Sequence, residues 1–278
     1  MPSVSTWLLW IALLCAAANA FGGTPADELA AFTRAYDARH WGIAPSDYVY
    51  GALIFSADAK RQYDDIMAFP PFALVVDRGK AMWETPFRNG KTYAGCFPNG
   101  GRNAAGNYPY FDDARGKVVT FEMALNDCRQ ANGEPELDLS DMHSTGVLTA
   151  YARSLSDGMA MNIKVESPQA LAAFDAGRRT YFARRGQLDF SCAICHVDQA
   201  GRHIRNEFLS PAIGQATHWP VFRAPGDVLT TLQYRYHLCY TMLRAKPPAI
   251  GSEEFNNLEY FHSYLSNGLP LKASVFRK

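Results

Sequence analysis

Ser191-Cys192-Ala193-Ile194-Cys195-His196 is the stretch that decides the fold of this chain, because it contains the pattern C-x-x-C-H. This pattern is typical of covalent haem attachment. Two thiols at this spacing add to the two vinyl groups of a haem, and the next histidine supplies the proximal iron ligand. A C-x-x-C alone could be a redox pair or half of a zinc site, but the chain has no second C-x-x-C. We therefore expect one haem c, attached to Cys192 and Cys195, with His196 on the iron.

The N-terminal sequence predicts that the protein is exported. Export is consistent with covalent haem attachment. Residues 7–18 are an unbroken apolar run, followed by the small-x-small site Ala18-Asn19-Ala20. This pattern is typical of a secretory signal peptide. The alternative is a retained membrane anchor, but the run is short for a span of about 20 residues. We expect cleavage after Ala20, a mature protein in the periplasm, and no membrane span in the mature chain.

Composition narrows the classes of partner. The chain has 278 residues, with 27 Lys and Arg against 27 Asp and Glu. This balance gives no indication of nucleic acid or an anionic membrane as a partner. Apolar residues make up 48% of the chain, which is enough for a packed core in one large domain or two small ones.

An internal repeat favours two domains. Both halves contain Leu-Ser-(Asp/Asn)-Gly at nearly the same distance after a cysteine, and a similar Asp-x-Gly-(Lys/Arg) stretch before one. The matching segments are 155–158 with 265–268, and 77–80 with 175–178. We predict a signal peptide at 1–20, a cytochrome c-like domain without haem at 21–165, and a haem-binding cytochrome c domain at 166–278.

The repeat also assigns the remaining cysteines. Cys96 takes the place of a haem cysteine, and Cys128 takes the place of Cys239. Two cysteines of a lost haem site would lie close together, so a Cys96–Cys128 disulfide is the economical interpretation. It would close a loop of about 30 residues and add about 3 to 4 kcal/mol of stability. Cys239 would then remain unpaired in the haem-bearing half.

Helical patterns make the predicted class mainly α, with few and short strands. Residues 24–38 form an expected helix, and Ser167-Pro168 supplies the N-cap and first residue of another. A third helix begins at Ser252, with acidic residues in its first turn. The side chains expected to face inward from the second and third helices are Leu171, Phe174, Tyr181, Phe255, Leu258, Phe261 and Leu265.

A further helix is expected between Gly226 and Pro247-Pro248. Its apolar residues fall at steps of three and four, which is one helical face. These residues are Leu229, Leu232, Tyr236, Cys239 and Leu243. Cys239 would therefore face the haem, and Arg235 would lie one turn away on the same side.

The residues alone do not decide which side chain is the sixth ligand of the iron. Cys239 and Met242 compete from the same helix, and isolated histidines add weaker candidates, namely His203, His218 and His237. Met ligation would make the chain a plain electron carrier with Cys239 buried and inert. An open site would suit a haem-based sensor or binding module.

A family resemblance favours one of these alternatives. The stretch Arg235-Tyr-His-Leu-Cys239-Tyr-Thr-Met242-Leu-Arg244-Ala245, followed by Gly251-Ser252-Glu253, is similar to the C-terminal signature of SoxA. SoxA is the larger subunit of the SoxAX cytochromes of bacterial sulfur oxidation. The haem motif and Trp219-Pro220 also fit that pattern. Since the first half lacks C-x-x-C-H, the chain resembles the monohaem branch, in which a disulfide stands in.

The resemblance implies a function and a set of partners. The activity is that of an L-cysteine S-thiosulfotransferase, which couples thiosulfate oxidatively to a cysteine of the carrier SoxYZ while electrons leave through haem. Cys239 is implied to bind the iron as a cysteine persulfide, and Arg235 to lie at the substrate entrance, with Arg244 as a further source of charge. A smaller SoxX-like subunit would supply a second haem in a heterodimer, and another cytochrome would accept the electrons. Thiosulfate dehydrogenases are a separate class that generally resembles dihaem proteins.

The proximal histidine carries one further expectation. Its second ring nitrogen should bond a backbone carbonyl, which orients the ring and tunes the iron. For the runner-up function, His196 would be paired with Met242 instead of Cys239.

Overall fold

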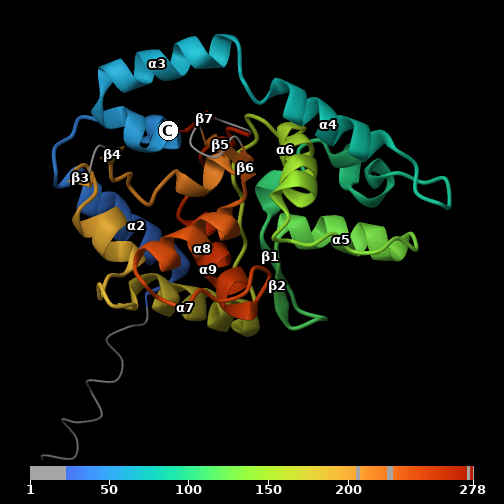
Figure 1. Cartoon of the computed structure of the whole chain (residues 1–278). Coiled ribbons are helices and arrows are strands. Elements are labelled where there is room, and N and C mark those ends of the chain that lie inside the picture. The colour runs from blue at the N-terminus through green and yellow to red at the C-terminus, as the bar shows by residue number, and fades with distance from the viewer. Residues whose placement is uncertain (1–22, 205–206, 224–227, 274–275, 278) are drawn as a thin grey trace, which may run out of the picture.

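Helices dominate the computed structural model, which describes residues 23–204, 207–223, 228–273 and 276–277 (Figure 1). The expected signal peptide lies outside the described residues. Within these ranges no helix is long and apolar enough to cross a membrane. The α-helices are α2 (Pro25–Asp37), α3 (Ala57–Ala68), α4 (Ala73–Glu84), α5 (Phe121–Ala131), α6 (Val147–Ser154), α7 (Pro168–Phe182), α8 (Leu232–Met242) and α9 (Glu253–Tyr264).

Short helical turns and strands fill the connections. The turns are η3 (Pro45–Phe55), η4 (Tyr93–Cys96), η5 (Pro98–Gly101), η6 (Ala105–Asn107), η7 (Met142–Gly146), η8 (Ile194–Asp198) and η9 (Gln215–His218). Antiparallel pairs join β1 (Tyr110–Asp112) to β2 (Lys117–Val119) and β3 (His203–Ile204) to β4 (Glu207–Phe208). A three-stranded sheet has the order β6 (Val228–Thr230), β5 (Val221–Arg223), β7 (Phe276–Arg277). The described strands are short, as the sequence predicted.

Side-chain caps fix the starts of three predicted helices. Thr24 accepts a hydrogen bond from the Asp27 amide, and Ser167 accepts one from the amide of Ala170. Ser252 caps α9 in the same way. Each cap satisfies one of the amides that a first helical turn leaves unpaired. These helix starts, predicted from the sequence, are confirmed.

Two helix pairs cross with their backbones close together. A Cβ placed on Gly79 of α4 would lie 2.3 Å from the Val147 carbonyl oxygen of α6. A Cβ on Gly177 of α7 would lie 1.9 Å from the Asn257 carbonyl oxygen of α9. Only glycine permits either approach, so these two residues set the distance between the paired helices.

The buried face of α7 differs in one residue from the prediction. Phe174 and Tyr181 are buried, but Leu171 is 40% exposed, so its predicted inward orientation is wrong. The buried stripe instead runs through the small residues Ala170, Ala173 and Gly177, which let α9 approach. All four residues predicted to face inward from α9 and its end are fully buried, namely Phe255, Leu258, Phe261 and Leu265.

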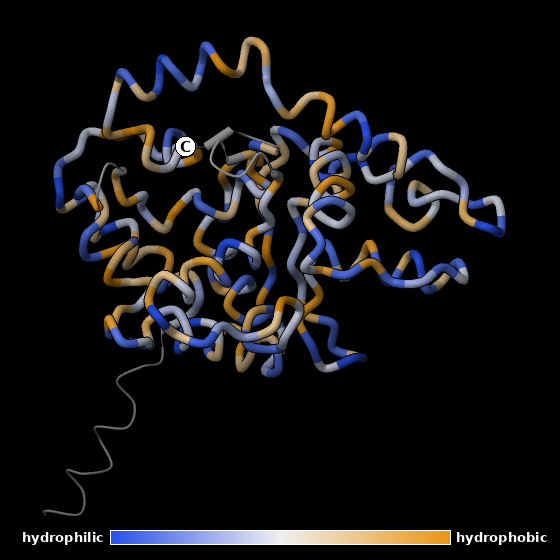
Figure 2. The backbone as a smooth tube through the Cα atoms, viewed as in Figure 1, coloured by the Kyte–Doolittle hydropathy of each residue, from blue (hydrophilic) through white to orange (hydrophobic). Residues whose placement is uncertain are grey.

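The N-terminal elements pack on the second half of the chain. Figure 1 shows α2 beside α7, and Phe32 of α2 packs edge-on against Tyr181 with ring centroids 6.1 Å apart. Glu28 of α2 pairs with Arg178 of α7 at 2.9 Å. One continuous hydrophobic core contains residues of both halves, including Trp83 and Phe174. In Figure 2 α3 crosses the top of the view, and hydrophilic residues recur along its outer side.

Candidate functional site

The C-x-x-C-H motif leads into η8, a single π-type turn that carries Cys195 and His196. Ser191, just before the motif, accepts a hydrogen bond from the Ile194 amide at 3.1 Å. The Nδ1 atom of His196 lies 2.9 Å from the Ser210 carbonyl oxygen, as predicted for the second ring nitrogen. Since a carbonyl oxygen can only accept, Nδ1 carries the proton and Nε2 keeps its lone pair. Burial lowers the pKa of His196 to about 4, so the ring is neutral at pH 7, the form that binds iron.

Cys239 lies within electrostatic reach of the two attachment cysteines. Burial, and after it the nearby charge of Cys239, raises the pKa of Cys192 to about 12. The pKa of Cys195 is raised by the same two causes. Such electrostatic coupling requires the sulfurs to lie near one another. The structure thus brings together the two attachment cysteines and Cys239, although Cys239 is separated from them by more than 40 positions.

Cys239 is carried by α8, which is shorter than predicted at both ends. The helix begins at Leu232 with Thr231 as its N-cap, whose side chain accepts a hydrogen bond from the Tyr234 amide. The prediction that Leu229 is helical is wrong, because Leu229 pairs with Phe222 in the β5–β6 ladder. At the other end Arg244 adopts a left-handed φ of 56°. The helix therefore ends before Pro247-Pro248, the predicted stop.

Met242 lies at the surface. The residue is 53% exposed. Cys239, one turn earlier, is half-buried. The two residues that competed for the iron therefore occupy different environments, and only Cys239 shares one with the attachment cysteines.

Arg235 lies within electrostatic reach of the proximal histidine. Its positive charge contributes to lowering the pKa of His196, which places the two groups within electrostatic reach. Among the described residues its side chain makes no hydrogen bond or ion pair. Arg244 is exposed and donates a long hydrogen bond of 3.4 Å to Gln187. Of the two arginines, Arg235 is the one whose charge acts on His196.

Tyr36 of α2 and Arg39, which follows the C-cap of that helix, bind the backbone at the haem motif. The Tyr36 hydroxyl donates to the His196 carbonyl oxygen at 2.6 Å, and Arg39 donates to the Val197 carbonyl oxygen at 2.8 Å. The sequence analysis missed both residues. No local signal could have found them, because they lie about 160 positions from the backbone that they bind.

A second missed group surrounds the residue after Cys239. The Arg185 guanidinium stacks over the Tyr240 ring, 4.5 Å from its centroid, and donates to the Tyr240 hydroxyl and to the Thr180 carbonyl oxygen. The Tyr240 hydroxyl in turn donates to Glu254 at 2.8 Å. These contacts fasten the end of α8 to the loop that leads into the haem motif.

The donor set fits a haem, which is not itself part of the structure. The Tyr181 hydroxyl is buried and has no hydrogen-bond partner among the described residues. It lies close enough to Cys192 and Cys195 for their charges to raise its pKa, although burial is the larger cause. A buried hydroxyl left without a partner is costly, so an absent group beside these cysteines accounts for it.

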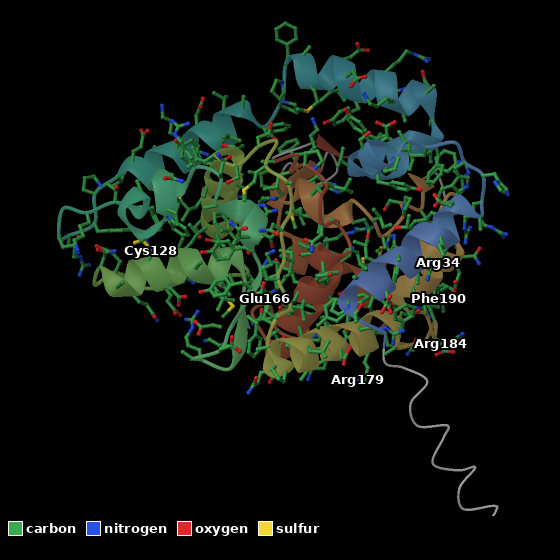
Figure 3. All side chains as sticks on the ribbon, turned by 180° about the vertical axis from the view of Figure 1, so that it is seen from behind. Arg34, Cys128, Glu166, Arg179, Arg184 and Phe190 are labelled. Atoms are coloured by element: carbon green, nitrogen blue, oxygen red, sulfur yellow. A yellow bond between two sulfur atoms is a disulfide. The ribbon has the colours of Figure 1, made fainter. Side chains whose placement is uncertain are left out.

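The predicted disulfide is present in the first half. Cys96 and Cys128 are joined with an S–S distance of 2.03 Å. Figure 3 shows Cys128 on the opposite side of the molecule from Phe190, which directly precedes the haem motif. The disulfide is therefore remote from the three-sulfur cluster.

The helical fold and the C-x-x-C-H site define a c-type cytochrome. A family model described as the SoxA/TsdA cytochrome c domain matches residues 78–161. The chain is 44% identical over 232 residues to the L-cysteine S-thiosulfotransferase subunit SoxA of Chlorobaculum tepidum, covering 84% of this chain and 80% of that protein. It is 39% identical to the protein of the same name from Allochromatium vinosum, covering 92% and 91%. The chain therefore belongs to the SoxA family.

The fold agrees with a solved relative. The crystal structure of SoxXA from P. pantotrophus contains a chain that matches with a TM-score of 0.72 and 28% identity, covering 78% of this chain and 84% of that one. The predicted resemblance and the mainly helical, cytochrome c-like fold are thus confirmed.

Proposed function

We propose that this protein is the SoxA subunit of an L-cysteine S-thiosulfotransferase that couples thiosulfate to a cysteine of a SoxYZ-like carrier. The relatives' shared name supports the activity. The observation that carries the proposal for this chain is the placement of Cys239 with Cys192 and Cys195 while Met242 faces solvent. A plain electron carrier with Met242 on the iron would require the opposite arrangement.

The overall reaction joins two sulfur atoms and removes two electrons. The carrier thiol loses its proton, a new S–S bond forms to the sulfane sulfur of thiosulfate, and the two electrons pass to an electron-acceptor cytochrome. A haem c held by Cys192, Cys195 and His196 would supply an acceptor for single electrons. The sulfane sulfur of thiosulfate would bond to a Cys239 persulfide as the two electrons leave. The carrier thiolate would then take the whole thiosulfate group and release the persulfide.

Arg235 would bind the anionic substrate. Thiosulfate carries two negative charges, and a guanidinium offers a fork of donors that suits an oxyanion. An arginine already held in an ion pair would have to break it first, whereas Arg235 makes none among the described residues. The action of its charge on His196 supports a binding place for the anion near the haem motif. Arg244, exposed at the end of α8, would add longer-range attraction.

The two-domain repeat, with haem only in the second half, is part of the proposal. The glycine crossings of α4 with α6 and of α7 with α9 support it, because each glycine meets a carbonyl and then a Cβ four residues further on. Ser156 and Ser266, from the two Leu-Ser motifs, also accept equivalent hydrogen bonds from backbone amides. Ser156 accepts from the Ala105 amide at 3.0 Å, and Ser266 accepts from the Gly214 amide at 3.1 Å.

The remaining assignments follow from the family. We propose a SoxX-like partner that carries a second haem, consistent with the structural match to a SoxXA complex. We also propose cleavage after Ala20 and a periplasmic location. The domain division at residues 165 and 166 stays a prediction, and the packing of α2 on α7 means that the N-terminal elements serve the second half.

Mass spectrometry of the mature, co-purified protein under non-reducing conditions tests the proposal. We expect one haem on Cys192 and Cys195 and one additional sulfur on Cys239. Kinetics then separate the roles. Arg235→Ala should raise the thiosulfate concentration needed for half-maximal rate, Cys239→Ala should abolish coupling, and Met242→Leu should leave both the activity and the haem spectrum unchanged. An unmodified Cys239 together with a Met242→Leu variant of altered spectrum would replace the proposal with the electron carrier.

A further inference from the structure

The side-chain amide of Gln215 touches the proximal histidine. Its terminal amide atom, placed as Nε2, lies 2.8 Å from Nδ1 of His196 and 2.6 Å from the Ser210 hydroxyl. Gln215 begins η9, and only 9% of its surface is exposed.

The bond to the Ser210 carbonyl decides what Gln215 can do. Because Nδ1 of His196 must carry a proton to bond that carbonyl, it is a donor and cannot accept from an amide N–H. An amide nitrogen at 2.8 Å would therefore set two donors against each other. A half turn of the amide exchanges Oε1 with Nε2, and the oxygen then accepts from Nδ1–H and from the Ser210 hydroxyl together.

We propose that Gln215, through Oε1, is a second hydrogen-bond acceptor for Nδ1–H of His196, and that it is a positioning residue that lowers the reduction potential of the attached haem. The proposal rests on the haem attachment in the proposed function, but not on sulfur transfer. An acceptor on Nδ1–H increases the basicity of the other ring nitrogen. A more basic ligand stabilises ferric over ferrous iron, so two acceptors give a lower potential than one.

The surrounding backbone keeps Gln215 in place. A Cβ on Gly214, which has a φ of 83°, would lie 2.2 Å from the Tyr48 carbonyl oxygen, so this turn is pressed against η3. The Ala212 amide donates to the His196 carbonyl oxygen at 3.1 Å, and the Gln215 amide donates to the Ala212 carbonyl oxygen at 3.2 Å. Backbone hydrogen bonds through Ala212 thus connect Gln215 to His196.

Redox titration of holo-protein variants tests the proposal. Gln215→Met keeps the approximate volume but removes the strong acceptor, and we expect a higher midpoint potential than in the wild type. Gln215→Glu offers an acceptor oxygen in either protonation state and should keep the potential at or below the wild-type value. Thr217→Val is the matched control, since the Thr217 hydroxyl donates to the Gly214 carbonyl oxygen on the same turn without reaching His196.

The possible outcomes separate this proposal from the one on which it rests. If Gln215→Met carries covalent haem by mass but titrates like the wild type, the second-acceptor proposal is wrong. If Gln215→Met and Thr217→Val shift the potential equally, the effect is a loosened turn and the proposal is again wrong. If even the wild-type protein has no haem on Cys192 and Cys195, the attachment itself fails. An ¹⁵N chemical shift of His196 Nδ1 that changes in Gln215→Met but not in Thr217→Val would support the proposal independently.

Discussion

Replacing Gly177 with alanine should destabilise the protein, although alanine is the better helix former. The added Cβ would lie 1.9 Å from the Asn257 carbonyl oxygen and 2.9 Å from the Phe261 Cβ. Real Cβ atoms essentially never lie within 3.0 Å of such atoms, so α7 and α9 must separate by about 1 Å. The atom in the way belongs to a helix backbone and cannot rotate aside.

The size of the effect follows from two opposing terms. Overpacking of a tight core costs about 1 to 3 kcal/mol, and a rigid carbonyl places Gly177 at the upper end. The helix propensity of alanine returns about 1 kcal/mol. The free energy of unfolding should therefore fall by about 2 kcal/mol, which corresponds to a decrease in Tm of about 4 to 8 °C for a chain of this size.

Thermal and urea unfolding of the holo-protein, followed by circular dichroism, measure this loss. Ala172→Gly is the control, because Ala172 is an exposed residue of the same helix. There the glycine should cost about 1 kcal/mol through propensity alone. If Gly177→Ala were as stable as the wild type, or more stable, the close crossing of α7 and α9 would be refuted.

Two other perturbations probe parts of the molecule away from the sulfur cluster. The double variant Cys96→Ser/Cys128→Ser should lose about 3 to 4 kcal/mol of stability in urea titrations, because the bond spans 32 positions, while the haem spectrum stays unchanged; a changed spectrum would contradict the remoteness of the disulfide. Burial, with Glu122 nearby, raises the pKa of Glu259 from 4.5 to about 8, so the folded protein holds a proton that the unfolded chain releases between these values. Stability should thus fall as pH rises from about 5 to 8, by at most about 1.4 kcal/mol per pH unit, and Glu259→Gln should flatten the curve; an equally steep variant would exclude Glu259 as the cause.

Local signals in the sequence were sufficient for the helix starts and for the haem motif. Thr24, Ser167 and Ser252 cap their helices through atoms three residues away, which a sequence displays directly. The C-x-x-C-H motif is equally local. The disulfide required one step more, the alignment of the two halves, and that alignment pointed to the correct pair of cysteines.

Tertiary contacts decided the features that the sequence analysis missed. Leu229 has a helical spacing to Leu232, yet its backbone pairs with β5, and the N-cap Thr231 was the local signal that was overlooked. Leu171 is apolar, as expected for an inward-facing residue. However, α9 packs against the neighbouring face of α7, which contains Gly177, and Leu171 lies outside that contact. Gln215 meets His196 only because the loop folds back, and no periodicity records such a contact.

The first half of the chain, which has no C-x-x-C-H, still has a direct role in positioning the site. The Thr231 amide, at the start of α8, donates to the sulfur of Met142 in η7 at 3.4 Å. Gly146 of the same turn sits so close to the Leu229 carbonyl oxygen that a Cβ would come within 3.0 Å. Both contacts lie at the start of α8, the helix that carries Arg235 and Cys239. The first half, which has no C-x-x-C-H motif, therefore supplies part of the surface on which α8 begins.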